Sequence, residues 1–95
     1  MYIIDLTYKV PVETIDLHLE NHVEYVKKQY TEGNFIASGR KIPRTGGIIF
    51  SKVTSRSELK KIISQDPFKQ HDLAKYEIIE FAPSRTCPQL TYLME

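Results

Sequence analysis

The sequence has little of what marks specialised classes of protein. Its single cysteine, Cys87, excludes an internal disulfide and suggests a reducing compartment. Asp5 and Lys9 interrupt the amino-terminal segment that a signal peptide would keep apolar, and no apolar run approaches the length of a membrane span. With 13 Lys and Arg against 12 Asp and Glu, the net charge of +1 gives no basic field for nucleic acid. We therefore predict a cytoplasmic protein with neither nucleic-acid nor membrane partners.

What the sequence does contain is typical of one compact domain. Hydrophobic residues make up 41% and charged residues 26% of the 95 residues. A chain of this length buries roughly two-thirds of its unfolded surface, which is enough for a single core. We therefore predict one globular unit.

Hydrophobic periodicity predicts the order of its elements. A period of two is typical of strands, and a period of three to four is typical of helices. The predicted elements are, in order, a strand in 1–10, a helix in 15–30 that stops near Gly33, strands in 34–42 and 46–53, a helix in 55–64, a turn capped by Asp66 and Pro67, and a strand in 75–82.

This βαββαβ order predicts an α+β, ferredoxin-like fold, with a four-stranded antiparallel sheet and both helices on one face. The other face would carry an apolar and polar mixture, namely Ile3, Asp5, Thr7, Ile79 and Phe81. Left bare, this surface would be a sizeable apolar patch. A homodimer that packs two such faces together would bury the apolar part and leave a polar-lined cavity.

Three segments carry a resemblance to a known family. The stretches "HVEYVKKQYTEGNFIASG", "DPF" and "YEIIEFAP" resemble, in order and spacing, the YciI-like (YCII-related) family, over nearly all of residues 2–83. The resemblance implies a dimeric α+β barrel, related in fold to muconolactone isomerases and cofactor-independent monooxygenases. It also implies a domain at 1–83 and a tail at 84–95, which we expect to be docked on the dimer. The few family members with an assigned reaction act on small aromatic-derived compounds such as chlorinated hydroquinones.

The resemblance places the family's proposed active centre on two residues of this chain. The family His falls on His22 and the family Asp on Asp66. An imidazole that titrates near neutrality suits a general acid or base, although a half-buried structural histidine is the alternative. Asp66 suits both a helix cap and an imidazole partner, because a carboxylate has two oxygens.

The segment "GRKIPRTGG" concentrates three cations between two predicted strands. Arg40 stands where the family often has proline, so this wall of the pocket differs from that of its relatives. Alternation places Ser38 and Arg40 on one strand face and Lys41 on the other, toward solvent. One interpretation is an anion clamp, in which guanidinium groups of Arg40 and Arg44 and backbone N–H groups of residues 45–47 contact a ligand. Ser38, Gly39 and Tyr8 are the further substrate-binding candidates. The other is a solvated hairpin whose glycines serve turn geometry.

Two classes of function remain open from the sequence. One is a small-molecule enzyme of lyase, dehalogenase or isomerase type, which uses a His22 and Asp66 acid/base pair on an anionic or aromatic-derived substrate. The other is a non-catalytic module that binds a small anion or assembles with itself. His18 and His22 share a helical face but lack further ligands, so we predict no metal and no cofactor. A haem-dependent oxygenase, with His22 as the axial ligand, is a further alternative.

Overall fold

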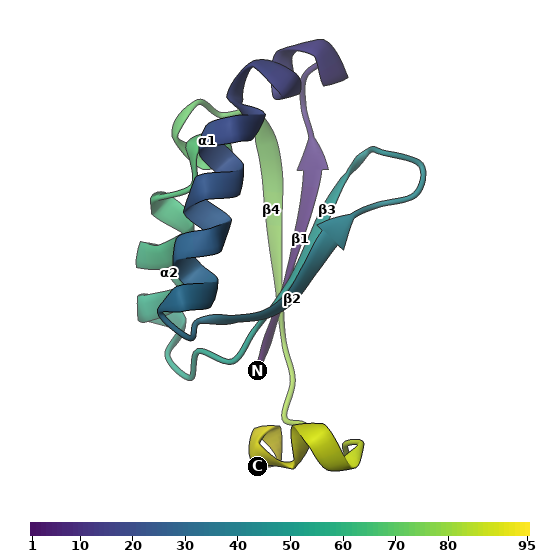
Figure 1. The fold of residues 1–95 in the computed structure, drawn as a ribbon, viewed down its shortest axis with the longest axis vertical. Helices are drawn as coiled ribbons and strands as arrows, with labels where there is room; N and C mark the ends of the chain where they lie inside the picture. The colour runs from purple at the N-terminus through teal and green to yellow at the C-terminus, as the bar shows by residue number, and fades with distance from the viewer.

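The computed structural model describes all 95 residues and confirms the predicted order of strands and helices (Figure 1). The turn predicted at Asp66 opens a one-turn helix, and a short 3-10 helix that the sequence did not predict forms in the tail. The elements are β1 (Tyr2–Tyr8), α1 (Val12–Thr31), β2 (Phe35–Arg40), β3 (Gly46–Ser51), α2 (Arg56–Ser64), α3 (Pro67–Gln70), β4 (Ala74–Glu80) and η1 (Pro88–Leu93).

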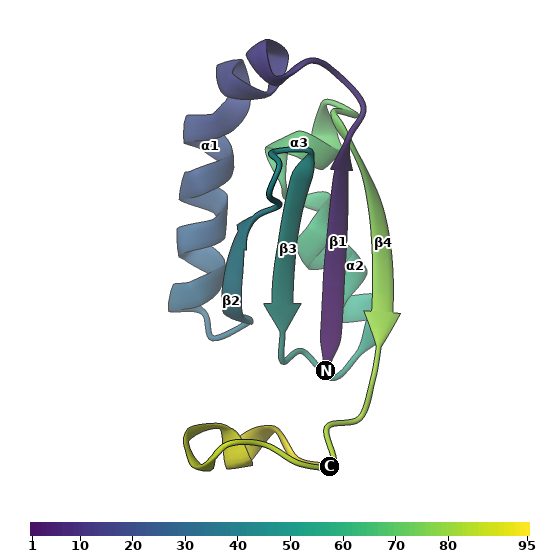
Figure 2. The ribbon, with the colours of Figure 1, turned by 90° about the vertical axis from the view of Figure 1, so that its right-hand side faces the viewer.

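The four strands form one antiparallel sheet in the order β2-β3-β1-β4. Figure 2 views this sheet with α2 and α3 behind it and α1 beside β2. Figure 1 shows that the helices lie on one side of the sheet and leave its other face uncovered. This arrangement confirms the predicted α+β, ferredoxin-like protomer.

The core lies between the sheet and the helices. Tyr2, Ile4 and Leu6 alternate inward along β1 and are at most 2% exposed. Helix α2 contributes its apolar stripe of Leu59, Ile62 and Ile63. Burying one such side chain is worth about 1.5–3 kcal/mol, so this layer is the main source of stability.

A tight turn sets the position of β2 against α1. Gly33 has a φ of +79°, the left-handed conformation that glycine adopts at the end of a helix. The amide of Asn34 donates to the carbonyl of Gln29 at 2.9 Å, and its side chain donates to Gln29 Oε1 at 2.8 Å. The chain therefore returns as β2 alongside the helix that it has just left.

The uncovered face of the sheet combines apolar side chains with two ion pairs, one of which joins Lys75 to Glu77 within β4. The register places Ile3 between Phe50 and Ile79, and the latter two are 38% and 52% exposed. Lys41 does lie on the opposite side from Arg40, but it is not free in solvent as predicted. Its ammonium group lies 2.5 Å from the Asp5 carboxylate, so this cation belongs to the open face.

Gly46 is required by close packing rather than by turn geometry. Only Gly33 among the glycines has a positive φ, whereas Gly46 lies in β3 opposite Thr7. A Cβ at position 46 would lie 1.8 Å from the carbonyl oxygen of Leu6. The prediction that the loop glycines serve the turn is therefore wrong for Gly46, whose missing side chain lets β3 approach β1.

The tail leaves the domain below the sheet and ends in η1 (Figure 2). The amide of Glu95 donates to the carbonyl of Pro83 at 3.1 Å, and the Lys52 ammonium lies 5.4 Å from the centre of the Tyr92 ring. Tyr92 itself is 60% exposed. Across the whole chain, no helix has the length and apolar character that a bilayer span needs.

Candidate active site

The local sequence around Asp66 fixes its carboxylate at the start of α3. Pro67 occupies the first helical position, where its missing N–H leaves no hydrogen bond unmade. The Asp66 side chain caps the helix, because its Oδ1 accepts from the amide of Phe68 at 3.0 Å. The cap holds the carboxylate in one orientation.

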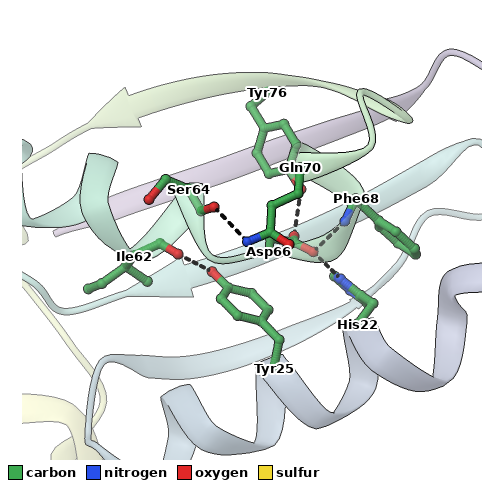
Figure 3. A network of polar contacts seen from close by, with 8 residues as sticks. All are labelled: His22, Tyr25, Ile62, Ser64, Asp66, Phe68, Gln70 and Tyr76. Carbon is green, nitrogen blue, oxygen red and sulfur yellow. Dashed lines mark hydrogen bonds and ion pairs between the residues drawn. The ribbon is translucent and has the colours of Figure 1, made fainter.

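Two further donors meet the same carboxylate (Figure 3). His22 Nδ1 lies 2.8 Å from Oδ1, and the Tyr76 hydroxyl donates to Oδ2 at 2.5 Å. The Asp66 side chain is only 1% exposed. These donors give the buried carboxylate the hydrogen bonds that it would otherwise make with water.

The contact with Asp66 determines the tautomer of His22. An ionised carboxylate can only accept hydrogen bonds, so Nδ1 must carry the proton. The imidazole also stacks on the Phe68 ring, with centroids 3.9 Å apart and planes inclined by 4°. In neutral His22, Nε2 is therefore the unprotonated nitrogen, and no protein group hydrogen bonds to it.

Two tyrosines close the buried side of this pair. Burial, and then the charge of Asp66, raise the pKa of Tyr76 far above the ordinary tyrosine value. The same two causes raise the pKa of Tyr25, whose hydroxyl donates to the carbonyl of Ile62 at 2.9 Å. Both hydroxyls therefore stay protonated, and that of Tyr76 remains a donor to Asp66.

A cavity of about 390 Å³ lies beside His22, between α1 and the β2–β3 hairpin. Nine of its 17 lining residues are hydrophobic, and this size and character suit a small organic ligand. Most of the residues that the sequence predicted for the site line it. They are Tyr8, His22, Ser38, Gly39, Arg40 and Arg44.

Asp66 does not line the cavity but contacts it through His22. The pair thus has one member facing the cavity and one member buried behind it. His22 has 15% of its side chain exposed, against 1% for Asp66. A buried carboxylate behind a more exposed imidazole is also the arrangement found in hydrolytic triads.

Arg44 is held by the protein itself. One of its Nη atoms donates to Asp16 Oδ1 at 2.6 Å, which ties the hairpin loop to α1. This hydrogen bond is the main reason why the pKa of Arg44 lies above its ordinary value. Arg44 therefore borders the cavity with its guanidinium group already paired.

Sequence reasoning missed Tyr76, Phe68 and the cavity-lining Lys27. Tyr76 could have been found from alternation in β4, because it faces inward together with Ile78. Lys27 gave no such signal, since it is 69% exposed and only its packing at the cavity rim distinguishes it from other helix lysines.

The two histidines of the predicted helical face have different neighbours. The His18 ring lies beside that of His71, with centroids 4.3 Å apart and planes inclined by 36°, whereas His22 contacts Asp66. No group of three or more His, Cys, Asp or Glu side chains gathers anywhere in the chain.

Comparison with known proteins adds a family and a fold. The model of the YCII-related domain matches residues 1–82. Among solved structures, 5-chloro-2-hydroxyhydroquinone dehydrochlorinase (TftG) from Burkholderia phenoliruptrix AC1100, in complex with 2,5-dihydroxybenzoquinone, superposes with a TM-score of 0.71 at 14% identity. The match covers 85% of this chain and 93% of that one. At this identity the likeness shows the fold alone. No curated protein matches the sequence.

Proposed function

The chain belongs to the YCII-related family, and we propose that it is a small-molecule enzyme in which His22 transfers a proton. The observation that supports this proposal most strongly is the 2.8 Å contact of His22 with the buried Asp66 beside a ligand-sized cavity. A histidine with a purely structural role has no need to leave one ring nitrogen unbonded at the wall of such a cavity.

The reaction that this geometry supports begins with a general base. Neutral His22 accepts a substrate proton on Nε2 and becomes an imidazolium. Asp66 stabilises the new positive charge through the Nδ1–H, and Tyr76 holds the carboxylate in place. If the substrate carries a halogen at a suitable carbon, the electron pair freed by deprotonation expels it as halide. If not, His22 returns the proton at another atom, which is an isomerisation.

We propose an aromatic-derived or similarly compact anionic substrate. The fold neighbour is a dehydrochlorinase with a bound quinone, which makes lyase or dehalogenase chemistry the first class to test. The apolar lining suits a ring, and Arg40 and the backbone near Ser38 and Gly39 suit its oxygen substituents. Tyr8 adds a hydroxyl at the same wall.

A non-catalytic anion-binding module is the second candidate. The observation that favours it is the set of cations around the cavity, which explains ligand binding without any proton transfer. The two candidates differ in what they require of His22, because only the enzyme needs its Nε2.

We also propose that the chain is a homodimer joined through its open sheet face. Support comes from the exposed Phe50, Ile79 and Phe81 on that face, which a partner copy would cover. The tail beyond residue 83 would then dock on the dimer, since it lies below the sheet (Figure 2) and its Tyr92 is exposed.

Turnover of a panel of chlorinated hydroquinones and hydroxylated aromatic acids tests the enzyme proposal. We expect His22→Gln to lower the rate by about 10²–10⁴-fold, the usual contribution of a general base. His18→Gln is the matched control, because His18 lies one turn earlier on α1 and does not line the cavity. A His22→Gln protein that turns over a substrate at the wild-type rate would refute the proposal.

A further inference from the structure

The cavity wall has one sign of charge. Its lining includes three cations, Lys27, Arg40 and Arg44, and no Asp or Glu. An apolar cavity bordered only by positive charge raises the local concentration of small anions. Among ligands of similar shape, the cavity should therefore prefer those that carry a negative charge.

The three cations are not equivalent. The Asp16 carboxylate accepts a hydrogen bond from Arg44 at 2.6 Å, so this side chain is already paired. The Arg40 side chain has neither a hydrogen bond nor an ion pair. The acidic neighbour of Lys27 is Glu24, with Nζ and Oε1 3.8 Å apart. Glu24 is 71% exposed, so solvent screens this contact. Lys27 and Arg40 are the cations that remain available to a ligand.

A hydrogen bond between α1 and β2 shows where these two cations lie. The Tyr30 hydroxyl and the Ser38 hydroxyl are 2.7 Å apart, which joins the helix wall of the cavity to its strand wall. Lys27 comes one helical turn before Tyr30, and Arg40 comes two residues after Ser38. Each cation therefore shares a face of its element with one member of this contact.

Both cations therefore flank this contact and border the same cavity as His22. Lys27 is five residues after His22 on α1, or about 7.5 Å along the helix axis. One six-membered ring spans this distance between opposite substituents.

From this geometry we infer that Lys27 and Arg40 form a carboxylate subsite that selects ring-sized ligands with an anionic group opposite the atom presented to His22. The inference rests on the proposed function for the role of His22, and it narrows the substrate class. Val23 and Val26, between the two ends of the site on α1, pack against the ring. The Tyr30 and Ser38 hydroxyls line the same cavity, and the one that accepts in their mutual hydrogen bond can donate to a carboxylate oxygen.

Equilibrium binding of two matched probes tests the subsite. The probes are 4-hydroxybenzoate and its neutral isostere 4-hydroxybenzamide, titrated calorimetrically against the full chain. We expect the wild-type protein to prefer the carboxylate. Lys27→Met and Arg40→Gln should each reduce that preference by about three- to tenfold, as expected for the loss of one partly screened charge contact.

Lys28→Met is the matched control for the helix. It removes the same charge from the adjacent residue of α1, which pairs with Glu32 and does not line the cavity. The preference for the carboxylate should be unchanged in this variant. Equal binding of the two probes by the wild-type protein, no measurable binding of the carboxylate, or an equal effect of Lys28→Met would each overturn the inference.

The binding measurement separates this inference from the proposed function. It needs no turnover, so the subsite can be present in a protein that catalyses nothing. A carboxylate preference that depends on Lys27 and Arg40, together with full activity of His22→Gln, would retain the subsite and reject the enzyme. Catalysis that depends on His22 without any carboxylate preference would retain the enzyme and reject the subsite.

Discussion

At the scale of single residues, the central feature is a buried carboxylate that has several donors and one solvent-accessible partner. The Asp66 carboxylate accepts hydrogen bonds from the amide of Phe68, the hydroxyl of Tyr76 and Nδ1 of His22. Removing any donor leaves part of a buried charge without its hydrogen bonds, which is more costly than losing the same contact at the surface. The network therefore contributes to stability and to the orientation of His22 at once.

Tyr76→Phe should measure the contribution of this network to stability. At neutral pH we expect the free energy of unfolding to fall by about 1–3 kcal/mol, because Asp66 loses a hydrogen bond to a charged acceptor. Urea denaturation of the variant and the wild-type protein measures this change. Tyr92→Phe, at an exposed tyrosine of the tail, is the control and should have no effect.

The raised pKa values of Tyr25 and Tyr76 predict how stability depends on pH. Tyrosines of the unfolded chain ionise at about pH 10, whereas these two stay protonated in the folded state. Their contribution is complete below pH 10 and is lost as the pH rises above it, because the unfolded state then releases protons that the folded state retains. The decline in unfolding free energy above pH 10 should be less steep in Tyr76→Phe. An unchanged slope would contradict the assignment.

At the scale of elements, the site depends on how closely the β2–β3 hairpin and α1 approach the rest of the fold. Gly46 allows β3 to lie against β1, and the Arg44 to Asp16 contact ties the loop to α1. The loop is therefore a structural part of the cavity wall as well as a source of charge.

Substitution of two of the three strand glycines, Gly46 and Gly39, should distinguish close packing from flexibility. Gly46→Ala would place a methyl group on the Leu6 carbonyl, and we expect a loss of about 3 kcal/mol or more, at the upper end for overpacking. Gly39→Ala meets nothing within 4 Å and should leave the midpoint of thermal unfolding within a few degrees of the wild-type value. Equal effects of the two substitutions would exclude the steric explanation.

The helices and strands were predictable from the sequence because their apolar residues recur with clear periodicity. Alternation identified β1, and the apolar spacing identified α1, with their ends near the observed residues. The contact of His22 with Asp66 came only from family resemblance, because the two residues are 44 positions apart and periodicity carries no information about such pairs. Lys41 and Gly46 were misinterpreted because the ion pair with Asp5 and the approach to Leu6 arise from the register of β1 and β3.

At the scale of the whole molecule, the sheet has one face covered by helices and one face open. The open face combines exposed Phe50 and Ile79 with two ion pairs, Asp5 with Lys41 and Lys75 with Glu77. Covering this face would bury apolar surface while each of these charges keeps its partner. The proposed homodimer follows from this combination.

Sedimentation velocity tests the dimer. We expect the wild-type chain to sediment as a dimer, and Phe50→Lys to shift it to the monomer because a charge would enter the apolar interface. Leu17→Lys is the control, since Leu17 is 79% exposed on α1 and lies away from the open face. A wild-type monomer, or a dimer that persists in Phe50→Lys, would exclude an interface at this face.

The most direct test of the central claim is long-range ¹H–¹⁵N NMR of the three histidine side chains, with and without 4-hydroxybenzoate. The neutral form of His22 should carry its proton on Nδ1, and its Nε2 resonance should shift when the ligand is added. His18 and His71, which do not line the cavity, are internal controls and should respond weakly. A proton on Nε2 of neutral His22, or an equal response of all three histidines, would contradict a proton-transfer site at His22 and Asp66.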